Sequence, residues 1–175
     1  MTRYNLSFAG AGRVAGALCK EMYRCGHKII QVSSETVVRG EALAHSCKAR
    51  WSGELTFEQA NDIIIVAVPD MNLEKVLSSI RCSEHTVLAH TAGSYGLDVF
   101  PAEIRNKGVF YPLQTFSKDR SINFRELPFL IEASNQGTEG ILKDLAESVK
   151  GQVHFIDTER RKMLHLAAVF VCNFT

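Results

Sequence analysis

The sequence predicts an α/β fold: a doubly wound, mostly parallel sheet with helices on both faces. Short apolar runs alternate along the chain with longer segments of helical period, which is the pattern of parallel α/β sheets. The clearest run, "DIIIVAV" at 62–68, holds six consecutive apolar residues, as expected for a strand buried on both faces. No internal repeat or low-complexity linker interrupts the pattern.

The first expected unit is a strand, a helix and a second strand. The run "YNLSF" at 4–8 predicts the strand, and apolar residues at three- and four-residue steps predict a helix over 13–25. Gly26 ends that helix as a left-handed cap would, and a strand over 28–32 follows. The later expected elements are a helix over 36–47, a short strand at 48–51, a strand over 62–68, a helix over 72–80, a strand over 86–90, a helix or turn over 96–105, strands over 108–112 and 128–133, a helix over 138–149 and a strand over 152–156.

The end of the chain predicts a separate helical segment over 157–175. Its last dozen residues, "LHLAAVFVCNFT", are almost wholly apolar, and a helix of this composition needs burial on most sides. Either it docks into a partner chain or it begins a further helical domain that is truncated here; we favour the second. The expected domains are therefore 1–156, a nucleotide-binding domain, and 157–175, the first helix of a helical dimerisation domain.

Composition argues against several classes of protein. The formal net charge is +1, so no basic excess points to nucleic acid, and no apolar stretch is long enough to span a membrane. The five cysteines are odd in number and scattered, with no metal-ligand spacing and no disulfide framework. We expect reduced thiols, no bound metal and a cytoplasmic location.

The stretch "FAGAGRVAGAL" gives G-x-G-x-x-A between the first strand and the first helix. Gly10 permits a tight turn, Gly12 keeps side-chain bulk away from a pyrophosphate, and Ala15 lets helix and strand approach closely. The alternative is a structural turn that binds nothing, but the surrounding strand–helix–strand unit favours a dinucleotide site. The cofactor-binding residues expected in this turn are Gly10, Ala11, Gly12, Arg13, Val14 and Ala15.

The end of the second strand bears on the choice between NAD and NADP. An acidic residue at this point favours NAD, and its replacement with a base nearby favours NADP. Ser33 and Ser34 could bind a 2′-phosphate and Arg39 could reach it, whereas Glu35 would repel it or hold an NAD ribose instead. We expect NADP in preference to NAD, with Glu35 a solvated residue of the next helix.

Five motifs occur in one order: "FAGAGRVAGAL", "VAVPD", "HTAGS", "GVFYPLQTFS" and "RRKMLHLAAVFVCNF". Together they resemble bacterial Rossmann-like oxidoreductase-related proteins that carry a C-terminal helical domain of unknown function. That group is similar to the 6-phosphogluconate-dehydrogenase-like superfamily, which includes pyrroline-5-carboxylate reductase, ketopantoate reductase, arogenate/prephenate dehydrogenase and deazaflavin-dependent NADP reductases. The resemblance implies NAD(P) binding and a homodimer formed through the helical region, but no particular substrate. Its members often have an arginine where this chain has Ser34, which weakens the inference of NADP.

Ligands of such sheets sit beyond the carboxyl ends of the strands. The resemblance places Val68 and Pro69 beside the cofactor, and Asp70 is a cofactor candidate whose alternative role is a helix N-cap. After the next strand, His90 could donate a proton to a carbonyl or imine, or could be a buried structural histidine. In the same motif we expect Thr91 and Gly93 at the cofactor and Ser94 at the substrate.

The loop after residue 112 supplies neutral polar groups. By resemblance it matches a loop that carries a His-Pro beside the substrate in arogenate-type dehydrogenases, and Tyr111 stands in place of that histidine. Gln114 and Thr115 suit substrate recognition more than proton transfer. The alternative is a structural loop.

The final helix carries polar residues on one stripe. Arg161 and His165 are four residues apart, and Ala168 continues the stripe. His165 could act as an acid or base, and Arg161 could bind a carboxylate or phosphate of the substrate. Asn173 is a substrate candidate because related enzymes use an asparagine on this helix. Structural pairing with a missing domain is the alternative for all three.

These observations favour an NAD(P)-dependent oxidoreductase that moves hydride between nicotinamide and a small carbonyl, imine or hydroxy acid. A non-catalytic NAD(P)-binding or sensor protein is the alternative, because no strand end carries an unambiguous acid–base couple. A methyltransferase is disfavoured, since such enzymes prefer G-x-G-x-G.

Overall fold

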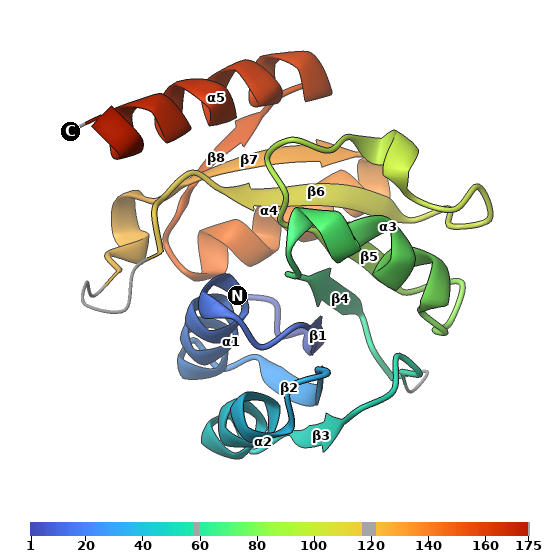
Figure 1. Cartoon of the computed structure of the whole chain (residues 1–175). Helices are drawn as coiled ribbons and strands as arrows, with labels where there is room; N and C mark the ends of the chain where they lie inside the picture. Colours follow the sequence, from blue (N-terminus) through green and yellow to red (C-terminus); the bar gives the residue numbers. More distant parts are fainter. Residues whose placement is uncertain (58–59, 117–121, 175) are drawn as a thin grey trace.

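The computed structural model describes residues 1–57, 60–116 and 122–174, with the backbone only for 172–174. Its strands form one eight-stranded sheet in the order β3-β2-β1-β4-β5-β6-β7-β8 (Figure 1). The strands are β1 Asn5–Ala9, β2 Lys28–Ser33, β3 Arg50–Ser52, β4 Ile63–Val66, β5 Val87–His90, β6 Lys107–Pro112, β7 Pro128–Ala133 and β8 Gln152–Phe155. The helices are α1 Arg13–Arg24, α2 Val37–Ser46, α3 Asp70–Ser79, α4 Gln136–Ser148 and α5 Thr158–Phe174.

The first six strands are parallel and run in the order 3-2-1-4-5-6 of a Rossmann fold. The chain reverses strand order between β1 and β4, and this switch point is where such sheets bind ligands. β7 is antiparallel to β6, and β8 is parallel to β7. The predicted mostly parallel, doubly wound sheet is confirmed.

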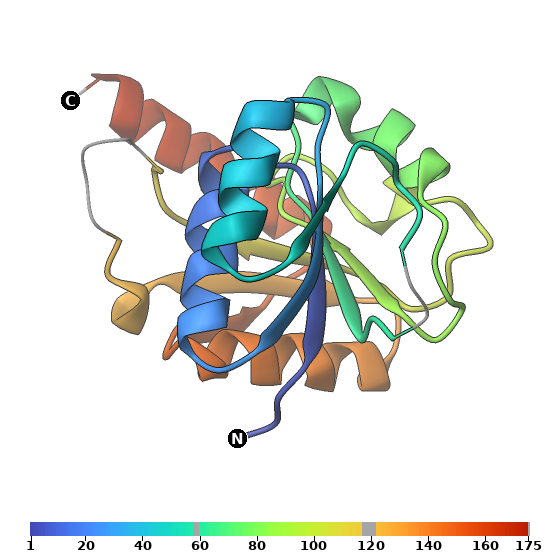
Figure 2. The same ribbon diagram turned by 90° about the horizontal axis from the view of Figure 1, so that it is seen from below.

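The sheet separates two apolar cores, because side chains alternate across each strand. In β4, Ile63 and Ile65 belong to the core beneath α1, α2 and α4, whereas Ile64 and Val66 belong to the core beneath α3. The view from below shows α1, α2 and α4 together, with α3 across the sheet from them (Figure 2). This two-sided burial explains the uninterrupted apolar run that identified β4.

The last helix, α5, lies over β6 and β7 on the α3 side of the sheet (Figure 1). It contacts Tyr111 of β6 and Glu132 of β7. The residue before each of these, Phe110 and Ile131 respectively, belongs to the core on the other face of the sheet. The carboxyl end of β6 therefore faces α5. That arrangement brings the final helix to the same edge of the sheet as the loop after β5.

The segment expected as a helix or turn over 96–105 contains the 3-10 turn Leu97–Val99, and a second 3-10 turn lies at Phe124–Glu126. The short third strand differs from the prediction, because it lies at Arg50–Ser52 and begins two residues later than expected. Gly26 does adopt a left-handed conformation, with φ of +93°. No helix in the described ranges is long and apolar enough to cross a membrane.

Candidate dinucleotide and substrate site

Gly10 makes the turn from β1 towards α1. Its φ is +115°, which favours glycine, and a Cβ at this position would collide with the backbone oxygen of Ala67. Its amide donates a hydrogen bond to the Ser33 carbonyl at 2.8 Å, which ties the turn to the end of β2. Gly10 is therefore required by the backbone itself.

In the described part of the protein, neither the backbone nor a neighbouring residue requires a glycine at position 12. Gly12 is the N-cap of α1 in an ordinary extended conformation, with φ −79° and ψ −167°. Apart from its chain neighbours, no atom of the described residues lies within 4 Å of a Cβ placed there. No side chain caps α1 in the described part of the chain, so the amides of its first turn point towards open space. A bare helix N-terminus behind a glycine with free space in front is the arrangement that a diphosphate needs.

A cleft of about 400 Å³ opens beside this turn, at the switch point of the sheet. Ala11 and Gly12 line it together with Val68 and Pro69, which follow β4. Leu55, Val68 and Val76 give it an apolar wall, as a planar adenine requires. The wall residues Leu55 and Val76 were missed by sequence reasoning, since isolated apolar residues of a loop and a helix give no signal of their own. The other lining residues are Ala9, Gly10, Ser33, Ser34, Glu35, Thr36, Arg39, Gly53, Ala67, Asn72, Lys75 and Ser79.

The three remaining residues predicted in the turn do different things. Ala15 is fully buried in the core beneath α1, as close packing of helix and strand requires, and half-buried Val14 packs against that core. Arg13 is exposed and lines a neighbouring groove beside α1 and α2 instead of the cleft.

The serines at the end of β2 already have partners. Ser33 is only 1% exposed, and its hydroxyl accepts a hydrogen bond from the Gln31 side chain at 2.7 Å. Ser34 donates to the Thr36 carbonyl at 3.0 Å and accepts from the Trp51 indole at 3.2 Å. Both line the cleft, whose exposed side chains include Glu35, Thr36 and Arg39 at this end, and Asn72, Lys75 and Ser79 on α3. Arg39 donates to the Thr36 hydroxyl at 3.3 Å.

His90 is held by the loop that follows it. Its Nδ1 accepts from the Ala92 amide at 3.1 Å, its Nε2 lies 3.1 Å from the Gly96 carbonyl, and its ring stacks on Phe100. Burial lowers the pKa of His90 to about 4. A neutral ring with both nitrogens bonded to backbone groups favours the structural alternative over a proton donor.

The rest of that loop connects β5 to α3 and α5. Ser94 donates to Asp70, the first residue of α3, whose N-cap is Pro69. Thr91 is half-buried and its amide donates to the Val66 carbonyl at 3.1 Å. Gly93 is buried beneath α5. Asp70 and Ser94 thus contact each other, and neither lines the cleft.

Arg161 is fully buried, and protein groups bind its guanidinium. Its guanidinium pairs with Glu132 at 2.6 Å and donates to the Tyr95 carbonyl at 2.6 Å. Thr158 adds a hydrogen bond to the same carboxylate at 2.8 Å. The expected role in binding a substrate anion is thus not supported by the geometry, because these protein groups already hold the charged end. Sequence reasoning missed Glu132, whose signal was a lone acid in an apolar strand.

His165 does contact another candidate. Its Nδ1 lies 2.8 Å from the Tyr111 hydroxyl, and the two rings meet edge to face with centroids 5.4 Å apart. His165 is half-buried, and the predicted stripe of Arg161, His165 and Ala168 is the face of α5 turned towards the sheet. The contact between Tyr111 and His165 joins two motifs 54 residues apart, which no sequence spacing reveals.

The other expected substrate residues are not brought into this cluster. Gln114 and Thr115 are exposed after the end of β6. The side chain of Asn173 lies outside the described residues. No group of three or more His, Cys, Asp or Glu side chains is placed to hold a metal in the described parts of the chain.

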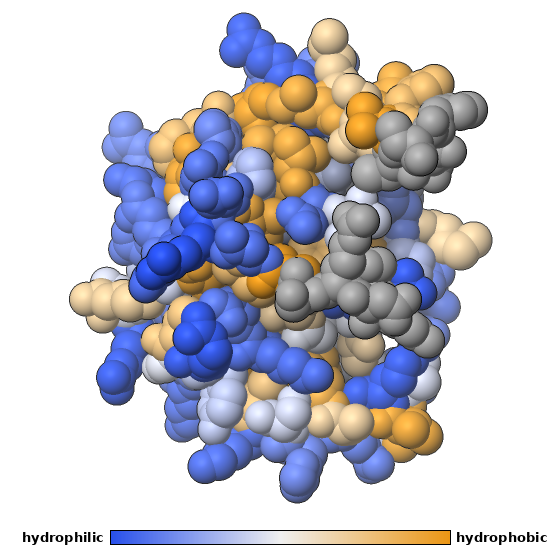
Figure 3. Space-filling model, turned by 90° about the vertical axis from the view of Figure 1, so that its left-hand side faces the viewer, coloured by the Kyte–Doolittle hydropathy of each residue, from blue (hydrophilic) through white to orange (hydrophobic). Residues whose placement is uncertain are grey.

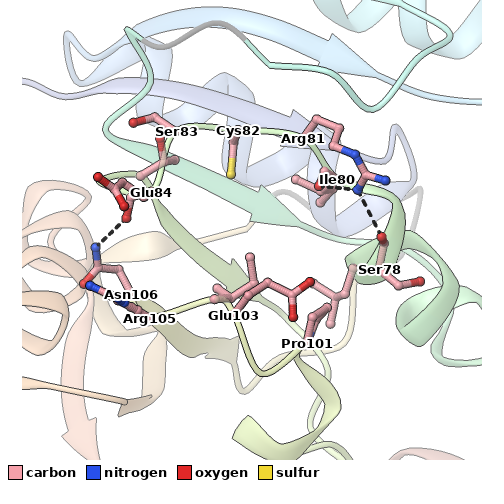
Figure 4. A pocket seen from close by; sticks show the side chains of 13 residues that line it. Ser78, Ile80, Arg81, Cys82, Ser83, Glu84, Pro101, Glu103, Arg105 and Asn106 are labelled. Carbon is pink, nitrogen blue, oxygen red and sulfur yellow. Dashed lines mark hydrogen bonds between the residues drawn. The ribbon is translucent and has the colours of Figure 1, made fainter.

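A second pocket, of about 480 Å³, lies at the opposite edge of the sheet (Figure 4). It is formed by the loops that precede β5 and β6, and includes Arg81, Cys82, Glu84 and Asn106. Arg81 donates to the carbonyls of Ser78 and Ile80, and Asn106 to that of Glu84. This pocket is separate from the glycine turn.

Comparison with known proteins decides the family. Residues 5–93, just over half of the chain, match the model of a family described as "NADP oxidoreductase coenzyme F420-dependent". The chain belongs to this oxidoreductase family. Residues 127–175 match a second model, a domain of unknown function (DUF2520), so the resemblance stated from the motifs is confirmed. No curated protein matches the chain.

Solved structures agree with the family assignment. A proposed NADP oxidoreductase from Bacteroides fragilis shares 37% identity, with a TM-score of 0.86 over 98% of this chain and 68% of that one. A protein from Thermotoga maritima shares 24% identity with a TM-score of 0.76, over 97% of this chain and 64% of that one. An imine reductase from Myxococcus stipitatus, in complex with NAD⁺, shares the fold at 18% identity and a TM-score of 0.73, over 97% and 60%. The present chain thus spans about two thirds of the length of each of these proteins.

The residues of the cleft fit the nicotinamide dinucleotide that the family implies. The relevant residue is Gly12: a Cβ there would meet no neighbouring atom of the described residues. The space beside this glycine is therefore not filled by another side chain and is open to a ligand. The uncapped N-terminus of α1 would hold the diphosphate, and the apolar wall would hold the adenine.

Proposed function

We propose that this chain binds NAD(P) in the cleft beside Gly12 and catalyses hydride transfer to or from a small carbonyl, imine or hydroxy acid. The observation that carries the proposal is the open face of Gly12 in front of the uncapped α1. The bound dinucleotide would supply or accept the hydride. The chain's own contribution is to bind the diphosphate through backbone amides and to exchange a proton with the substrate.

His165 is the proposed acid–base residue. Of the two histidines considered from sequence, His90 has both ring nitrogens bonded to the loop backbone, whereas His165 uses only Nδ1 in its contact with Tyr111. Nε2 of His165 is then the nitrogen that would exchange a proton with a substrate oxygen or nitrogen. His90 and Arg161 support the site by fixing the loop after β5 and the helix α5.

We further propose NADP as the preferred cofactor, with Arg39 as the residue that recognises the 2′-phosphate. Arg39 is exposed at the rim of the cleft, one helical turn after Thr36, and its guanidinium suits a phosphate. We assign this role to the arginine and not to Ser33 and Ser34, because the hydroxyls of both serines already make hydrogen bonds within the protein. Glu35 at the same rim is the group that would favour NAD.

A non-catalytic NAD(P)-binding or sensor protein stays the second candidate. It is favoured by the internal pairing of Arg161, which removes the carboxylate-binding group expected from the sequence. Both candidates require dinucleotide binding, and only the first requires turnover.

The experiment has two stages on the same protein. NADPH and NADH are first titrated and the thermal midpoint is followed; a ligand that binds the native state at a hundred times its Kd stabilises it by about 2.7 kcal/mol. Nicotinamide absorbance is then followed across a panel of keto acids, ketones and cyclic imines. Binding with turnover supports the enzyme, binding without turnover on any substrate supports the sensor, and no shift at millimolar ligand contradicts both.

The apolar face of α5 supports a proposed homodimer through this helix. Its large side chains, including Met163, Leu166 and Phe170, are 71%, 58% and 56% exposed. Apolar side chains gather along the upper part of the molecule, where α5 lies (Figure 3). Exposed apolar faces of this kind mark interaction sites.

A further inference from the structure

Tyr111 and His165 meet in a contact built by three separate segments. Tyr111 comes from the carboxyl end of β6, His165 from α5, and Gly93 from the loop after β5. A Cβ on Gly93 would lie 2.5 Å from His165 Nδ1 and 2.9 Å from the ring of Tyr111. The absence of a side chain at Gly93 is therefore what lets the two rings approach, with 2.8 Å between hydroxyl and Nδ1.

The rotation of α5 about its axis is fixed independently of this contact. Arg161 lies four residues before His165, on the same face of the helix, and is bound by Glu132 and by the Tyr95 carbonyl. His165 is thus directed at Tyr111 by the backbone of α5, and Tyr111 then determines how the imidazole is used.

We propose that Tyr111 is a positioning residue that holds the neutral His165 ring in the Nδ1–H tautomer, its phenolic oxygen accepting from Nδ1. This inference rests on the proposed acid–base role of His165. A proton can leave an imidazolium from Nε2 only if Nδ1 keeps its own proton, and a hydrogen bond from Nδ1–H to Tyr111 keeps it there. The same bond exists before and after the transfer, so the ring does not turn during the reaction.

A hydrogen bond in the opposite direction, from the Tyr111 hydroxyl to Nδ1, would prevent Nε2 of the neutral His165 ring from accepting a proton. If the Tyr111 hydroxyl donated to Nδ1, the neutral ring would carry its proton on Nε2, which would then have no lone pair with which to accept one. In reduction of a carbonyl or imine, the bound dinucleotide would supply the hydride. The imidazolium form of His165 would give its Nε2 proton to the substrate oxygen or nitrogen, which leaves the neutral Nδ1–H tautomer. Water returns that proton to Nε2 afterwards, so the cycle closes with Nδ1–H intact.

The test reads the tautomer directly by long-range ¹H–¹⁵N correlation of the histidine rings in ¹⁵N-labelled protein. His165→Asn identifies the His165 signals by their loss. The wild-type neutral ring is expected to show a protonated Nδ1 and an unprotonated Nε2. In Tyr111→Phe, which removes only the hydroxyl, the two nitrogen shifts are expected to move towards each other, while Tyr23→Phe on α1 leaves them unchanged. A wild-type ring protonated on Nε2, or a Tyr111→Phe spectrum identical to wild type, overturns the inference.

Turnover distinguishes failure of this inference from failure of the proposed function. If the wild-type ring is the Nδ1–H tautomer, Tyr111→Phe should lower kcat about tenfold or more while KM changes little. His165→Asn should lower kcat about 10²- to 10⁴-fold. Wild-type protein that turns over no substrate contradicts the function even where the spectrum shows the tautomer. If His165→Asn abolishes turnover and Tyr111→Phe does not alter it, the positioning role of Tyr111 is contradicted and the proposed function is not.

Discussion

At the scale of single residues, the two glycines of the turn separate folding from binding. Gly10 has a left-handed φ and would collide with Ala67 if it carried a side chain, so its replacement strains the backbone. Gly12 has an ordinary extended backbone and open space beside it, so we expect its replacement to leave folding intact and to fill the space in which we propose that the dinucleotide binds. One motif therefore contains a position that the backbone requires and a position with a proposed role in binding.

His90 predicts a specific loss of stability in acid. Burial lowers its pKa from 6.5 to about 4, so between these values the unfolded chain binds the proton and the folded chain does not. Stability is then present above pH 6.5 and falls as the pH drops towards 4, by about 3 kcal/mol in total. Urea unfolding from pH 7 to pH 4 measures it.

The control for this prediction is a pair of variants. His90→Asn should flatten the pH dependence by that amount, leaving the contribution of His27, whose pKa burial also lowers. His85→Asn, at an exposed position, should keep the full slope. An unchanged slope in His90→Asn contradicts the assignment of a neutral, structural histidine.

Arg39 predicts a change in cofactor preference. Arg39→Met removes the exposed guanidinium at the rim of the cleft, and should weaken NADPH binding about tenfold, or about 1.4 kcal/mol, while NADH binding changes little. Calorimetric titration of each cofactor measures it. Equal weakening of both would show that Arg39 does not meet the 2′-phosphate.

At the scale of elements, α5 is fixed by an asymmetric ion pair. Arg161 is 0% exposed and Glu132 is 21% exposed, so removing the acid leaves a buried charge without its counter-ion, whereas removing the base leaves a carboxylate that water can reach. Glu132→Ala should cost about 3–5 kcal/mol and Arg161→Met distinctly less. Chemical denaturation of both variants checks the order, and equal costs would contradict it.

Periodicity predicted the inner stripe of α5 correctly, because burial of one face repeats along the helix. It could not say that Arg161 meets Glu132 or that His165 meets Tyr111, because those partners come from strands that only the topology brings near. The same limit applies to Ser33: the residue type suited a phosphate, but the Gln31 side chain from its own strand already donates to its hydroxyl.

At the scale of the whole molecule, the alternation of strands and helices was enough to predict a mostly parallel sheet with helices on both faces. The antiparallel direction of β7 was not predictable, because apolar runs carry no direction. The family match and the cleft at the switch point then connect the fold with dinucleotide chemistry.

Assembly through α5 gives a prediction for sedimentation. If the exposed face of α5 joins two copies, Leu166→Glu should shift the chain from dimer to monomer at micromolar concentration, because a buried carboxylate without a partner is costly. Val38→Glu, also at an exposed apolar position but on α2, should leave the dimer intact. A wild-type monomer would contradict the proposed homodimer.

The most direct test of the central claim is calorimetric titration of NADPH and NADH into Gly12→Val, with Gly140→Val as the matched control. At both glycines an added Cβ would have no protein atom within 4 Å, but only Gly12 stands before the N-terminus of α1 in the cleft. Gly12→Val is expected to fold and to lose dinucleotide affinity by about a hundredfold or more, or about 2.7 kcal/mol, while Gly140→Val binds as wild type. Unchanged affinity in folded Gly12→Val would contradict the dinucleotide site.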